Sequence, residues 1–320
     1  MRLLTLLFCL FAGTAAAQDY PNKPVKILVP YGPGGATDII ARIVAAKLSE
    51  SMGHAFVVEN RPGANGNIAL EATAKAAPDG YTLLVGNVST NAINETIYEK
   101  QLTIRPSRDL VAITKLVEIP HIVVASAALP ANNIAELIAL AKKQPGKINF
   151  ASVGMGSYPH LDMEKFMKAS GTEFTHVPYK GGAGQAIPAM VGGEVQLAFF
   201  NMASLLPHIR SGRLKALAAI PTQRIPELPN VPTLAEQGFP GIGTNAWQGM
   251  FAPAATPKPV VDKLFGAVAA ALGRTDQREA LAKQMMSVEL SRSPTDFTEQ
   301  VRKETQDWGE FLRAARIKID

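Results

Sequence analysis

Residues 25–51 of the chain, VKILVPYGPGGATDIIARIVAAKLSES, decide its fold class. The apolar run over 25–30 predicts a strand, and the glycines that follow predict a sharp turn. Ile40, Val44 and Leu48 then recur at the spacing of one helix face, which predicts a helix over 37–51. A strand, a glycine loop and a helix in this order are the building unit of an α/β protein.

The same unit recurs along the 320 residues. Strands alternating with helices predict two α/β lobes, each a mainly parallel sheet flanked by helices. In the first lobe, further strands are predicted at 56–59 and 81–86 and a helix at 68–77. After Pro106 the second lobe has predicted strands at 122–125, 149–152, 174–179, 195–200 and 214–220 and helices at 134–143, 160–169 and 185–191. A strand at 248–252 and helices at 259–272 and 294–315 complete the chain.

The order of these elements predicts a discontinuous first lobe. We expect lobe one to comprise residues 18–112 and 248–293, lobe two residues 113–247, and a C-terminal helix, residues 294–320, to pack across the lobes. Strands near 111–116 and 249–252 would then cross between the lobes and form a hinge. The cleft between such lobes, at the carboxyl ends of the strands, is a natural place for a small ligand.

The N-terminus has the pattern of an export signal. Arg2 precedes an apolar run over 3–12, and three alanines that end at Ala17 supply a cleavage site. The run is too short to span a bilayer, and a large aromatic residue before Cys9 argues against lipoprotein processing. A buried N-terminal strand is the alternative. We expect residues 1–17 to be a signal peptide, whose removal takes away the only cysteine and leaves a soluble periplasmic protein.

Composition and motifs argue against several classes of function. The net charge of +5 is spread thinly without a basic run, which argues against nucleic acid as a partner. The sequence has no Gly-x-Ser-x-Gly, no Gly-x-x-x-x-Gly-Lys-[Ser/Thr] and no His-Glu-x-x-His motif. Its five histidines lack the spacing of metal ligands. We therefore expect no catalytic residue, no cofactor and no metal site.

Two loops of similar design, one in each predicted lobe, are the candidate ligand-binding elements. Tyr31 is followed by Gly34-Gly35 before one helix, and Lys180 by Gly181-Gly182 before another. Adjacent glycines bring main-chain N–H groups close to a ligand, and the following helix offers unpaired N–H groups and a partial positive charge. The two loops predict a cradle for a small anion. The alternative is that both glycine pairs only serve tight turns.

Neutral polar residues follow two further strands and are weaker candidates. They are Asn87, Ser89 and Thr90 in the first lobe and Ser152 and Ser157 in the second. Each set could form a polar wall of the cleft, although lone Ser and Asn residues in loops often only cap turns. Near the second crossing strand, Trp247 could flank the cleft or belong to the core.

Several longer motifs are shared with one known family. They are Val29-Pro30-Tyr31-Gly32-Pro33-Gly34-Gly35 with Asp38, Val58-Glu59-Asn60-Arg61-Pro62-Gly63-Ala64 with Gly66, Pro78-Asp79-Gly80-Tyr81, Ser152 with Gly156-Ser157 and His160, and His176-Val177-Pro178-Tyr179-Lys180-Gly181-Gly182. With these motifs the chain resembles the substrate-binding proteins of tripartite tricarboxylate transporters, also called the Bug family. The resemblance covers nearly all of the chain after the signal peptide.

The resemblance implies a two-lobed periplasmic binding protein of the Venus-flytrap type, type II-like, that holds a carboxylate between the glycine loops, partly through bound water. Asn201 stands where such proteins often carry Asp, and this loss of negative charge would admit a ligand without an amino group. Tyr31 stands where Phe is common. The expected ligand-binding set is Tyr31, Gly34, Gly35, Asp38, Asn87, Ser89, Thr90, Ser152, Ser157, His160, Lys180, Gly181, Gly182, Ala183, Asn201 and Trp247.

The function that the resemblance implies is that of a monomeric receptor. It would close on a small organic carboxylate and deliver it to the membrane permease subunits of a tripartite tricarboxylate-type transporter. A sensor subunit that signals the ligand to a partner and an enzyme on the same fold are the alternatives. An enzyme would need an acid, base or nucleophile in the cleft, whereas the loops offer mostly glycine, neutral polar groups and Lys180.

Overall fold

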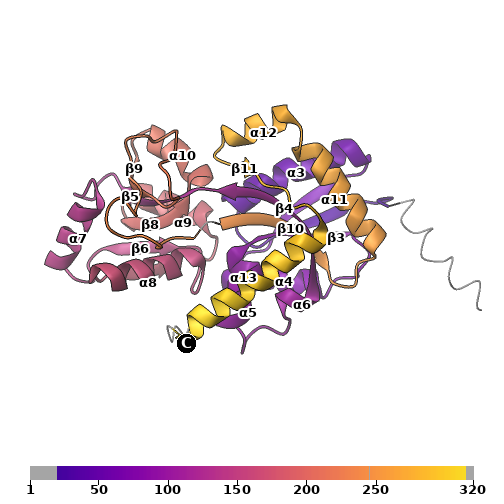
Figure 1. Ribbon diagram of the computed structural model, residues 1–320, viewed down its shortest axis with the longest axis horizontal. Helices are drawn as coiled ribbons and strands as arrows, with labels where there is room; N and C mark the ends of the chain where they lie inside the picture. The colour runs from indigo at the N-terminus through magenta and orange to yellow at the C-terminus, as the bar shows by residue number, and fades with distance from the viewer. Residues whose placement is uncertain (1–19, 245, 315–320) are drawn as a thin grey trace, which may run out of the picture.

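The chain forms two α/β lobes that lie side by side, with two strands running toward their junction (Figure 1). The computed structural model describes residues 20–244 and 246–314. The expected signal peptide, residues 1–17, lies outside the described residues.

Lobe one opens with the strand, glycine loop and helix that the sequence predicts. β1 is Val25–Val29 and α3 is Ala36–Met52, which ends at Gly53 in the left-handed conformation, with φ 72°. The remaining elements before the chain leaves this lobe are β2 (Phe56–Asn60), the 3-10 helix η1 (Ala64–Gly66), α4 (Asn67–Ala74), β3 (Thr82–Asn87), the π-helix η2 (Ser89–Ile93), α5 (Asn94–Ile97), α6 (Pro106–Asp109) and β4 (Leu110–Ile119).

Lobe two alternates strands and helices as predicted. Its elements are β5 (His121–Ser126), α7 (Ile134–Lys143), β6 (Asn149–Ser152), α8 (Tyr158–Ser170), β7 (Thr175–Pro178), α9 (Ala183–Gly192), β8 (Leu197–Asn201), α10 (Met202–Arg210) and β9 (Leu214–Ala219). The bounds of α7 and β6 agree with the sequence prediction, whereas α10 is not among the predicted helices. The chain returns to lobe one in β10 (Ala246–Pro253) and continues through α11 (Lys258–Leu272), α12 (Thr275–Ala282), β11 (Ser287–Val288) and α13 (Pro294–Ala314).

Both sheets are mixed, so the expectation of mainly parallel sheets is wrong. The sheet of lobe one has the order β11-β4-β10-β3-β1-β2. β1 is parallel to β2 and β3, but β10 is antiparallel to both β3 and β4, because it returns from lobe two against the direction of its neighbours. The sheet of lobe two has the order β7-β6-β8-β5-β9, with β6 parallel to β7 and β8 and with β5 antiparallel to β8 and β9.

The chain changes sheet later than the sequence analysis expects. β4 stays paired with β10 from Leu110 to Ile119, so all of it belongs to the sheet of lobe one. The expected boundary between residues 112 and 113 falls inside this strand and must move to Pro120, which lies between β4 and β5. On the return, Ala246 pairs with Ile119, so β10 enters the first sheet with its first residue.

Helices pack through apolar side chains on both faces of each sheet. The loops between strands and helices therefore lie at the edges of the sheets. In lobe one, α3 and α11 cover one face, where Val44 and Leu264 are buried. α4 and α13 cover the other face, where Leu70 and Phe297 are buried. In lobe two, α9 and α10 pack on one face and α7 and α8 on the other.

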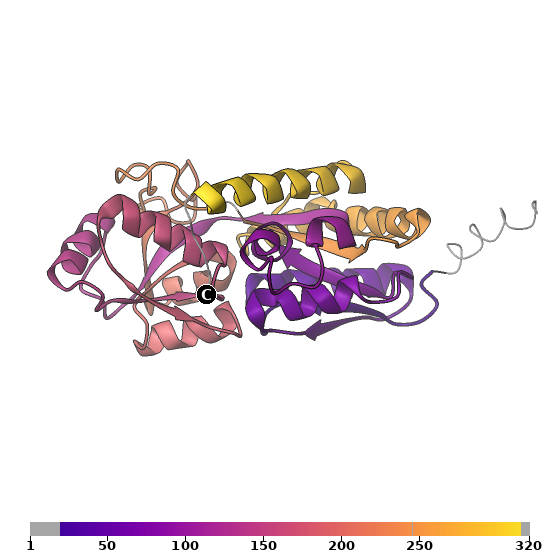
Figure 2. The ribbon, with the colours of Figure 1, turned by 90° about the horizontal axis from the view of Figure 1, so that it is seen from below.

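The C-terminal helix α13 lies along lobe one and reaches the junction of the lobes (Figure 2). It packs on β4, η2 and α5 of lobe one. Near its end, the ammonium of Lys165 in α8 lies 4.6 Å from the ring centroid of Trp308 and 4.3 Å from that of Phe311. The expected helix across the lobes thus has its main contacts in lobe one and this link to lobe two. Residues 315–320 lie outside the described part.

Candidate functional site

The segments that follow β1, β2 and β3 of lobe one meet the loops after β6 and β7 of lobe two. Because β1, β2 and β3 are parallel, as are β6, β7 and β8, the loops after them leave from one edge of each sheet. Hydrogen bonds join the two sets of loops, so the structure has its lobes closed on each other. These bonds run from the Gly32 N–H to the Gly181 carbonyl (3.0 Å), from the Tyr158 N–H to Ser89 Oγ (3.0 Å) and from the Tyr98 hydroxyl to the Met155 carbonyl (2.7 Å).

The two glycine loops touch through their main chains. A Cβ on Gly184 would lie 2.0 Å from the Pro33 carbonyl oxygen, and one on Gly32 would lie 2.7 Å from the Gly181 carbonyl oxygen. Real Cβ atoms do not approach a backbone oxygen so closely, so these positions need a residue without a side chain. The second loop also contains Gly182 with φ 74°, a conformation that glycine adopts without strain.

Asp38 holds the first glycine loop in place. Its side chain is buried, and Oδ2 accepts hydrogen bonds from the Gly34 N–H at 3.1 Å and from Arg42 Nε at 3.0 Å. Oδ1 accepts from Asn60 Nδ2 at 2.9 Å and lies 2.9 Å from an Arg42 nitrogen. Burial alone would raise the pKa of this carboxyl, but the hydrogen bonds from Arg42, Asn60 and Gly34 lower it. Both oxygens are therefore occupied, and Asp38 positions Gly34-Gly35 at the start of α3.

The predicted polar residues at the end of β3 and directly after it form a buried turn with Tyr31. Asn87 Oδ1 accepts from the Ser89 N–H at 2.9 Å and from the Tyr31 hydroxyl at 3.4 Å. Thr90 Oγ1 bonds back to the Asn87 N–H and carbonyl, both at 3.0 Å. Burial raises the pKa of Tyr31 far above its ordinary value, so its hydroxyl stays protonated. The turn is thus held by its own hydrogen bonds, while Ser89 also reaches lobe two.

The matching residues of lobe two form a second hydrogen-bonded cluster. Ser152 Oγ lies 2.6 Å from His176 Nε2 and accepts from the Gly154 N–H at 3.1 Å. The Ser157 hydroxyl donates to the Gly154 carbonyl at 2.7 Å. The ring of His160 stacks on that of His176, with centroids 4.0 Å apart. Burial, and then the neighbouring His160, lowers the pKa of His176 to about 3, so its ring is neutral at pH 7.

The second glycine loop brings α9 opposite α3. Lys180 in this loop is exposed, and the Gly181 N–H donates to Gln185 Oε1 at 2.8 Å. Ala183 begins α9, and its Cβ lies 3.9 Å from where a Cβ on Gly35 would stand. Gly35 precedes the first residue of α3. The N-termini of α3 and α9 therefore meet across the junction of the lobes.

Two of the predicted side chains are used elsewhere. Asn201 caps α10, because its Oδ1 accepts from the Ser204 N–H at 3.0 Å. Trp247 lies in the core of lobe one, only 2% exposed, with its ring packed edge-on to Phe297 and its Nε1 donating to Glu304 at 2.8 Å. These contacts correspond to the alternative that Trp247 belongs to the core, and its place beside the cleft stays a prediction. Successive side chains of a strand point to opposite faces of the sheet, and the side chain of Trp247 in β10 is on the face that α13 covers.

Comparison with known proteins identifies the family of the chain. The family model described as the tripartite tricarboxylate transporter family receptor matches residues 40–316. The chain belongs to this family. The receptor is 35% identical over 323 residues to Protein BugT of Bordetella pertussis, a match that covers 99% of this chain and 98% of BugT.

Solved structures confirm the fold class, that of a two-lobed periplasmic binding protein. Rpa4515 from R. palustris, solved with adipate, is 33% identical to this receptor with a TM-score of 0.89, and the match covers 94% of this chain and 99% of that one. MatC from Rhodopseudomonas palustris, solved with bound malate, is 32% identical with a TM-score of 0.85, covering 91% and 99%. The family resemblance drawn from the sequence motifs is thereby also confirmed.

The receptor brings residues to the junction that the sequence analysis missed. Asn65 packs against Gly154 of lobe two, Tyr98 bonds to the loop after β6, and Tyr158 bonds to Ser89. The dipeptide Asn65-Gly66 is a turn signal visible in the sequence, which could have drawn attention to this loop. The partner of Tyr98 is a main-chain carbonyl 57 residues away, for which the sequence carries no signal.

A buried carboxyl of lobe two holds the segment through which the receptor's chain returns to lobe one. Asp162 in α8 accepts from the Thr244 N–H at 2.9 Å and from the Thr244 hydroxyl at 2.8 Å. Burial raises the pKa of Asp162 to about 6, although Lys165 and the Thr244 hydrogen bonds oppose the shift. Because the folded pKa lies above the ordinary value of 3.8, the fold favours the protonated form between these two values.

We expect this carboxyl to lower the receptor's stability as the pH rises from 4 to 7. The contribution is fully present below pH 3.8 and is lost as the pH passes about 6. A shift of this size corresponds to about 3 kcal/mol in the free energy of unfolding. Urea unfolding at several pH values gives the free energy of unfolding of the parent and of Asp162→Asn. The difference between the two proteins measures the contribution of Asp162. A difference that stays constant from pH 4 to pH 7 would contradict the expectation.

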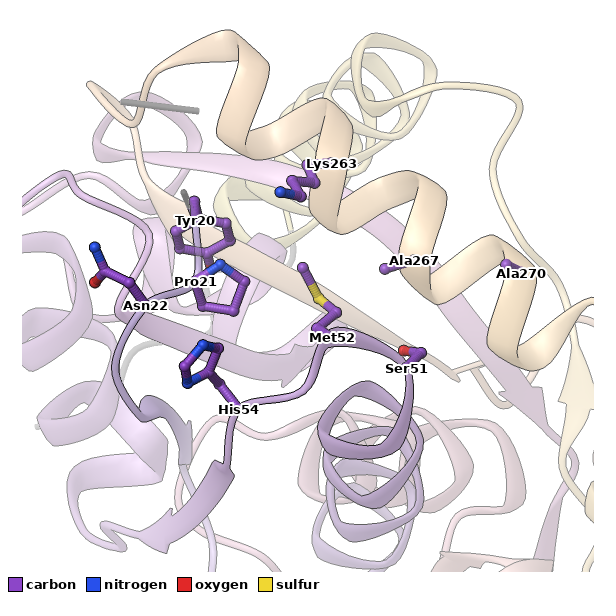
Figure 3. Close-up of a pocket in the computed structure, with 9 residues that line it drawn as sticks. All are labelled: Tyr20, Pro21, Asn22, Ser51, Met52, His54, Lys263, Ala267 and Ala270. Atoms are coloured by element: carbon purple, nitrogen blue, oxygen red, sulfur yellow. The ribbon is translucent and has the colours of Figure 1, made fainter. Parts of the chain in front are cut away.

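A separate hollow of about 720 Å³ lies at the other end of α3 (Figure 3). Ser51 and Met52 at the C-terminal end of α3 line it, together with Tyr20 and Lys263. The 17 residues of α3 span about 25 Å, so this hollow is far from the glycine loop at the N-terminal end. The Tyr20 hydroxyl there already donates to the Gly80 carbonyl at 2.7 Å. The hollow is thus distinct from the meeting point of the glycine loops.

Within residues 20–244 and 246–314 of the receptor, no group of three or more His, Cys, Asp or Glu side chains is placed to hold a metal ion. Among the helices of the same described part, none has the length and apolar character needed to cross a membrane.

Proposed function

We propose that this receptor captures a small organic carboxylate where its two glycine loops meet. The observation that carries the proposal is the approach of the N-termini of α3 and α9, at Gly35 and Ala183, across the closed lobes. The first N–H groups of a helix have no partner within the helix, and its N-terminus carries a partial positive charge. Two such termini that face each other favour an anion between them.

The side chains around the loops fit a ligand that brings its own negative charge. Asp38 has both oxygens occupied by Gly34, Asn60 and Arg42, so its charge is already compensated. His176 is neutral at pH 7. The relatives Rpa4515 and MatC were solved with adipate and malate, both of which are carboxylates. A micromolar affinity needs about 8 kcal/mol, and charge-assisted hydrogen bonds of roughly 1.5 to 3 kcal/mol each would supply much of it.

Delivery to the permease subunits of a tripartite tricarboxylate-type transporter is the second part of the proposal, supported by the family of the chain. The protein would bind and release its ligand without chemical change. It would act in the periplasm after cleavage behind Ala17, for which the charge, apolar run and alanines of the N-terminus are the support. The mass of the protein recovered from a periplasmic extract tests the cleavage site. Co-purification of permease subunits in the presence of ligand tests delivery.

Native mass spectrometry of the purified protein tests capture directly. We expect a carboxylate carried through purification, or added from a panel of mono- and dicarboxylic acids, to bind in a 1:1 complex. Titration calorimetry then gives the affinity, and the mass of the acid recovered after denaturation shows whether it has been altered. The absence of binding by every acid in the panel would overturn the proposal, and a chemically changed product would replace it with catalysis.

A further inference from the structure

Asn65 is held in one orientation by a buried cluster of three asparagines. Asn65 lies in η1, directly after β2, with φ 51° and with 6% of its surface exposed. The side-chain amide nitrogen of Asn94 donates to the main-chain carbonyl of Asn65 at 2.9 Å and to Asn67 Oδ1 at 2.6 Å. Since both protons of that nitrogen are used, Asn94 Oδ1 must accept, and it does so from Asn65 Nδ2 at 2.9 Å. The side-chain oxygen of Asn65 therefore points away from Asn94.

This oxygen is buried and has no hydrogen-bond partner among the described residues. It faces lobe two, because a Cβ on Gly154 would lie 3.2 Å from it. Gly154 cannot satisfy it: its N–H donates to Ser152 Oγ, and its carbonyl only accepts. A buried acceptor left without a donor costs free energy, and in native structures such a group usually has a partner from outside the protein chain or a functional reason.

The loop that carries Asn65 lies beside the first glycine loop. A Cβ on Gly66 would lie 2.8 Å from the Pro30 side chain and 2.6 Å from that of Thr90. Pro30 leads directly into Tyr31 and the glycines, and Gly154 belongs to the loop after β6 in lobe two. The unpaired acceptor is therefore at the junction of the lobes, next to the proposed carboxylate site.

Backbone strain marks the same place. Ala64 and Asn65 both have positive φ, 46° and 51°, a conformation that residues with a side chain adopt rarely. Consecutive residues in this region persist only where the surrounding structure holds them, and they occur often at ligand-binding sites. Here the strained turn directs the Asn65 side chain into the asparagine cluster and its oxygen toward lobe two.

We infer that Asn65 is a specificity-determining residue whose Oδ1 accepts a hydrogen bond from a hydroxyl group on the ligand, so that the preferred ligand is a hydroxylated dicarboxylate. The inference rests on the proposed function. A carboxylate oxygen has no proton to donate, so a ligand that bonds to this oxygen does so through a second group. The contacts of Asn65 are neutral amides and a glycine.

An ammonium group fits this position less well than a hydroxyl. A buried ammonium carries three donors and a full charge, and it needs a carboxylate or several acceptors. The carboxylate next along the chain from Asn94, Glu95, is already occupied by the N–H and the hydroxyl of Ser107, both at 2.8 Å. One neutral acceptor matches one hydroxyl, and the site therefore favours hydroxy acids over amino acids.

Matched series of acids test the inference on the unaltered protein. Each series contains the plain dicarboxylate, its 2-hydroxy derivative and its 2-amino derivative, with four carbons (succinate, malate, aspartate), five carbons (glutarate, 2-hydroxyglutarate, glutamate) or six carbons (adipate, 2-hydroxyadipate, 2-aminoadipate). In the series that binds, calorimetry is expected to give about tenfold tighter binding of the hydroxy acid than of the plain acid, with the amino acid weakest. Equal affinities for the plain and the hydroxy acid would overturn the inference.

A pair of variants assigns the preference to Asn65. Asn65→Gly keeps the backbone conformation, since glycine adopts φ 51° without strain, and removes the acceptor. We expect it to bring the affinities for the hydroxy and plain acids to within about twofold of each other, mainly by weakening the hydroxy acid. Asn230→Gly is the control, because it makes the same substitution at an exposed position of lobe two, outside the asparagine cluster. It should keep the preference of the parent.

The outcomes separate this inference from the proposed function. A preference that persists in Asn65→Gly, or that collapses equally in Asn230→Gly, overturns the role of Asn65 while the protein remains a carboxylate receptor. If no acid of any series binds, the proposed function fails and the inference fails with it. Thermal midpoints of both variants accompany the titrations, and the measurement on the unaltered protein needs no variant to fold.

Discussion

Gly184→Val is expected to abolish ligand binding while each lobe stays folded. Gly184 lies inside α9 with helical backbone angles, so valine causes no backbone strain there. Its Cβ would lie 2.0 Å from the Pro33 carbonyl oxygen of the other lobe, and a backbone atom cannot move aside as a flexible side chain can. The closed arrangement is therefore blocked. We expect an affinity loss of about a hundredfold or more, or about 3 kcal/mol, at the upper end of the cost of overpacking.

Gly192→Val is the matched control for this variant. It places the same side chain in the same helix, at a position where a Cβ has nothing within 4 Å. Calorimetry gives the affinities of both variants, and solution scattering gives the radius of gyration with and without the acid. The control should bind and close as the parent does. Binding of equal strength by Gly184→Val and Gly192→Val would show that the closed contact of the two glycine loops has no part in recognition.

Asp38→Ala is expected to produce the second large effect, a loss of both stability and affinity. The substitution leaves the Gly34 N–H and Asn60 Nδ2 without their acceptor and Arg42 without its ion-pair partner. Removing one partner of a buried, hydrogen-bonded network of this kind costs about 2 to 4 kcal/mol in the free energy of unfolding. Because Asp38 holds the first glycine loop, ligand affinity should fall as well, even though its carboxylate has no oxygen free for a ligand.

Denaturant unfolding and calorimetry of Asp38→Ala measure the two losses. Arg42→Leu is the comparison, since it removes the more exposed partner and keeps the Asp38 bonds to Gly34 and Asn60. It should cost less stability than Asp38→Ala. The pKa of Asp38 is lowered in the fold, so its contribution is present above the ordinary value of 3.8 and is lost as the pH falls below it. An Asp38→Ala protein as stable as the parent at pH 7 would contradict this role.

Local sequence patterns predicted most elements of the fold but not the direction of the strands. α7 and β6 have the bounds expected from apolar spacing and from the turn residues around them. The direction of β10 depends on where the chain re-enters lobe one, which no local pattern records. α10 was missed because it is short and contains Pro207, and residues 89–93 of η2 are polar enough to resemble a loop. In both cases contacts with the rest of the lobe stabilise a helix that the local sequence does not favour.

The candidate site could be located from the sequence, but the roles of its side chains could not. The glycine loops do lie opposite each other, because adjacent glycines before a helix are a strong local signal. Ser89 bonds to a residue 69 positions away, and Asn65 packs against Gly154 in the other lobe, so their roles depend on closure. Asp38 and Asn201 are committed to neighbours in their own lobe. Only the three-dimensional arrangement distinguishes such residues from those that face a ligand.

The main-chain bond between Gly32 and Gly181 has a kinetic consequence. A molecule enclosed behind the two glycine loops leaves only when the loops separate, even if its own contacts with the protein are weak. The time it spends inside is then bounded by the opening rate of the protein. Acids of different equilibrium affinity would then differ mainly in their rate of productive association. A membrane partner that separates the two glycine loops would release all of them at the same rate.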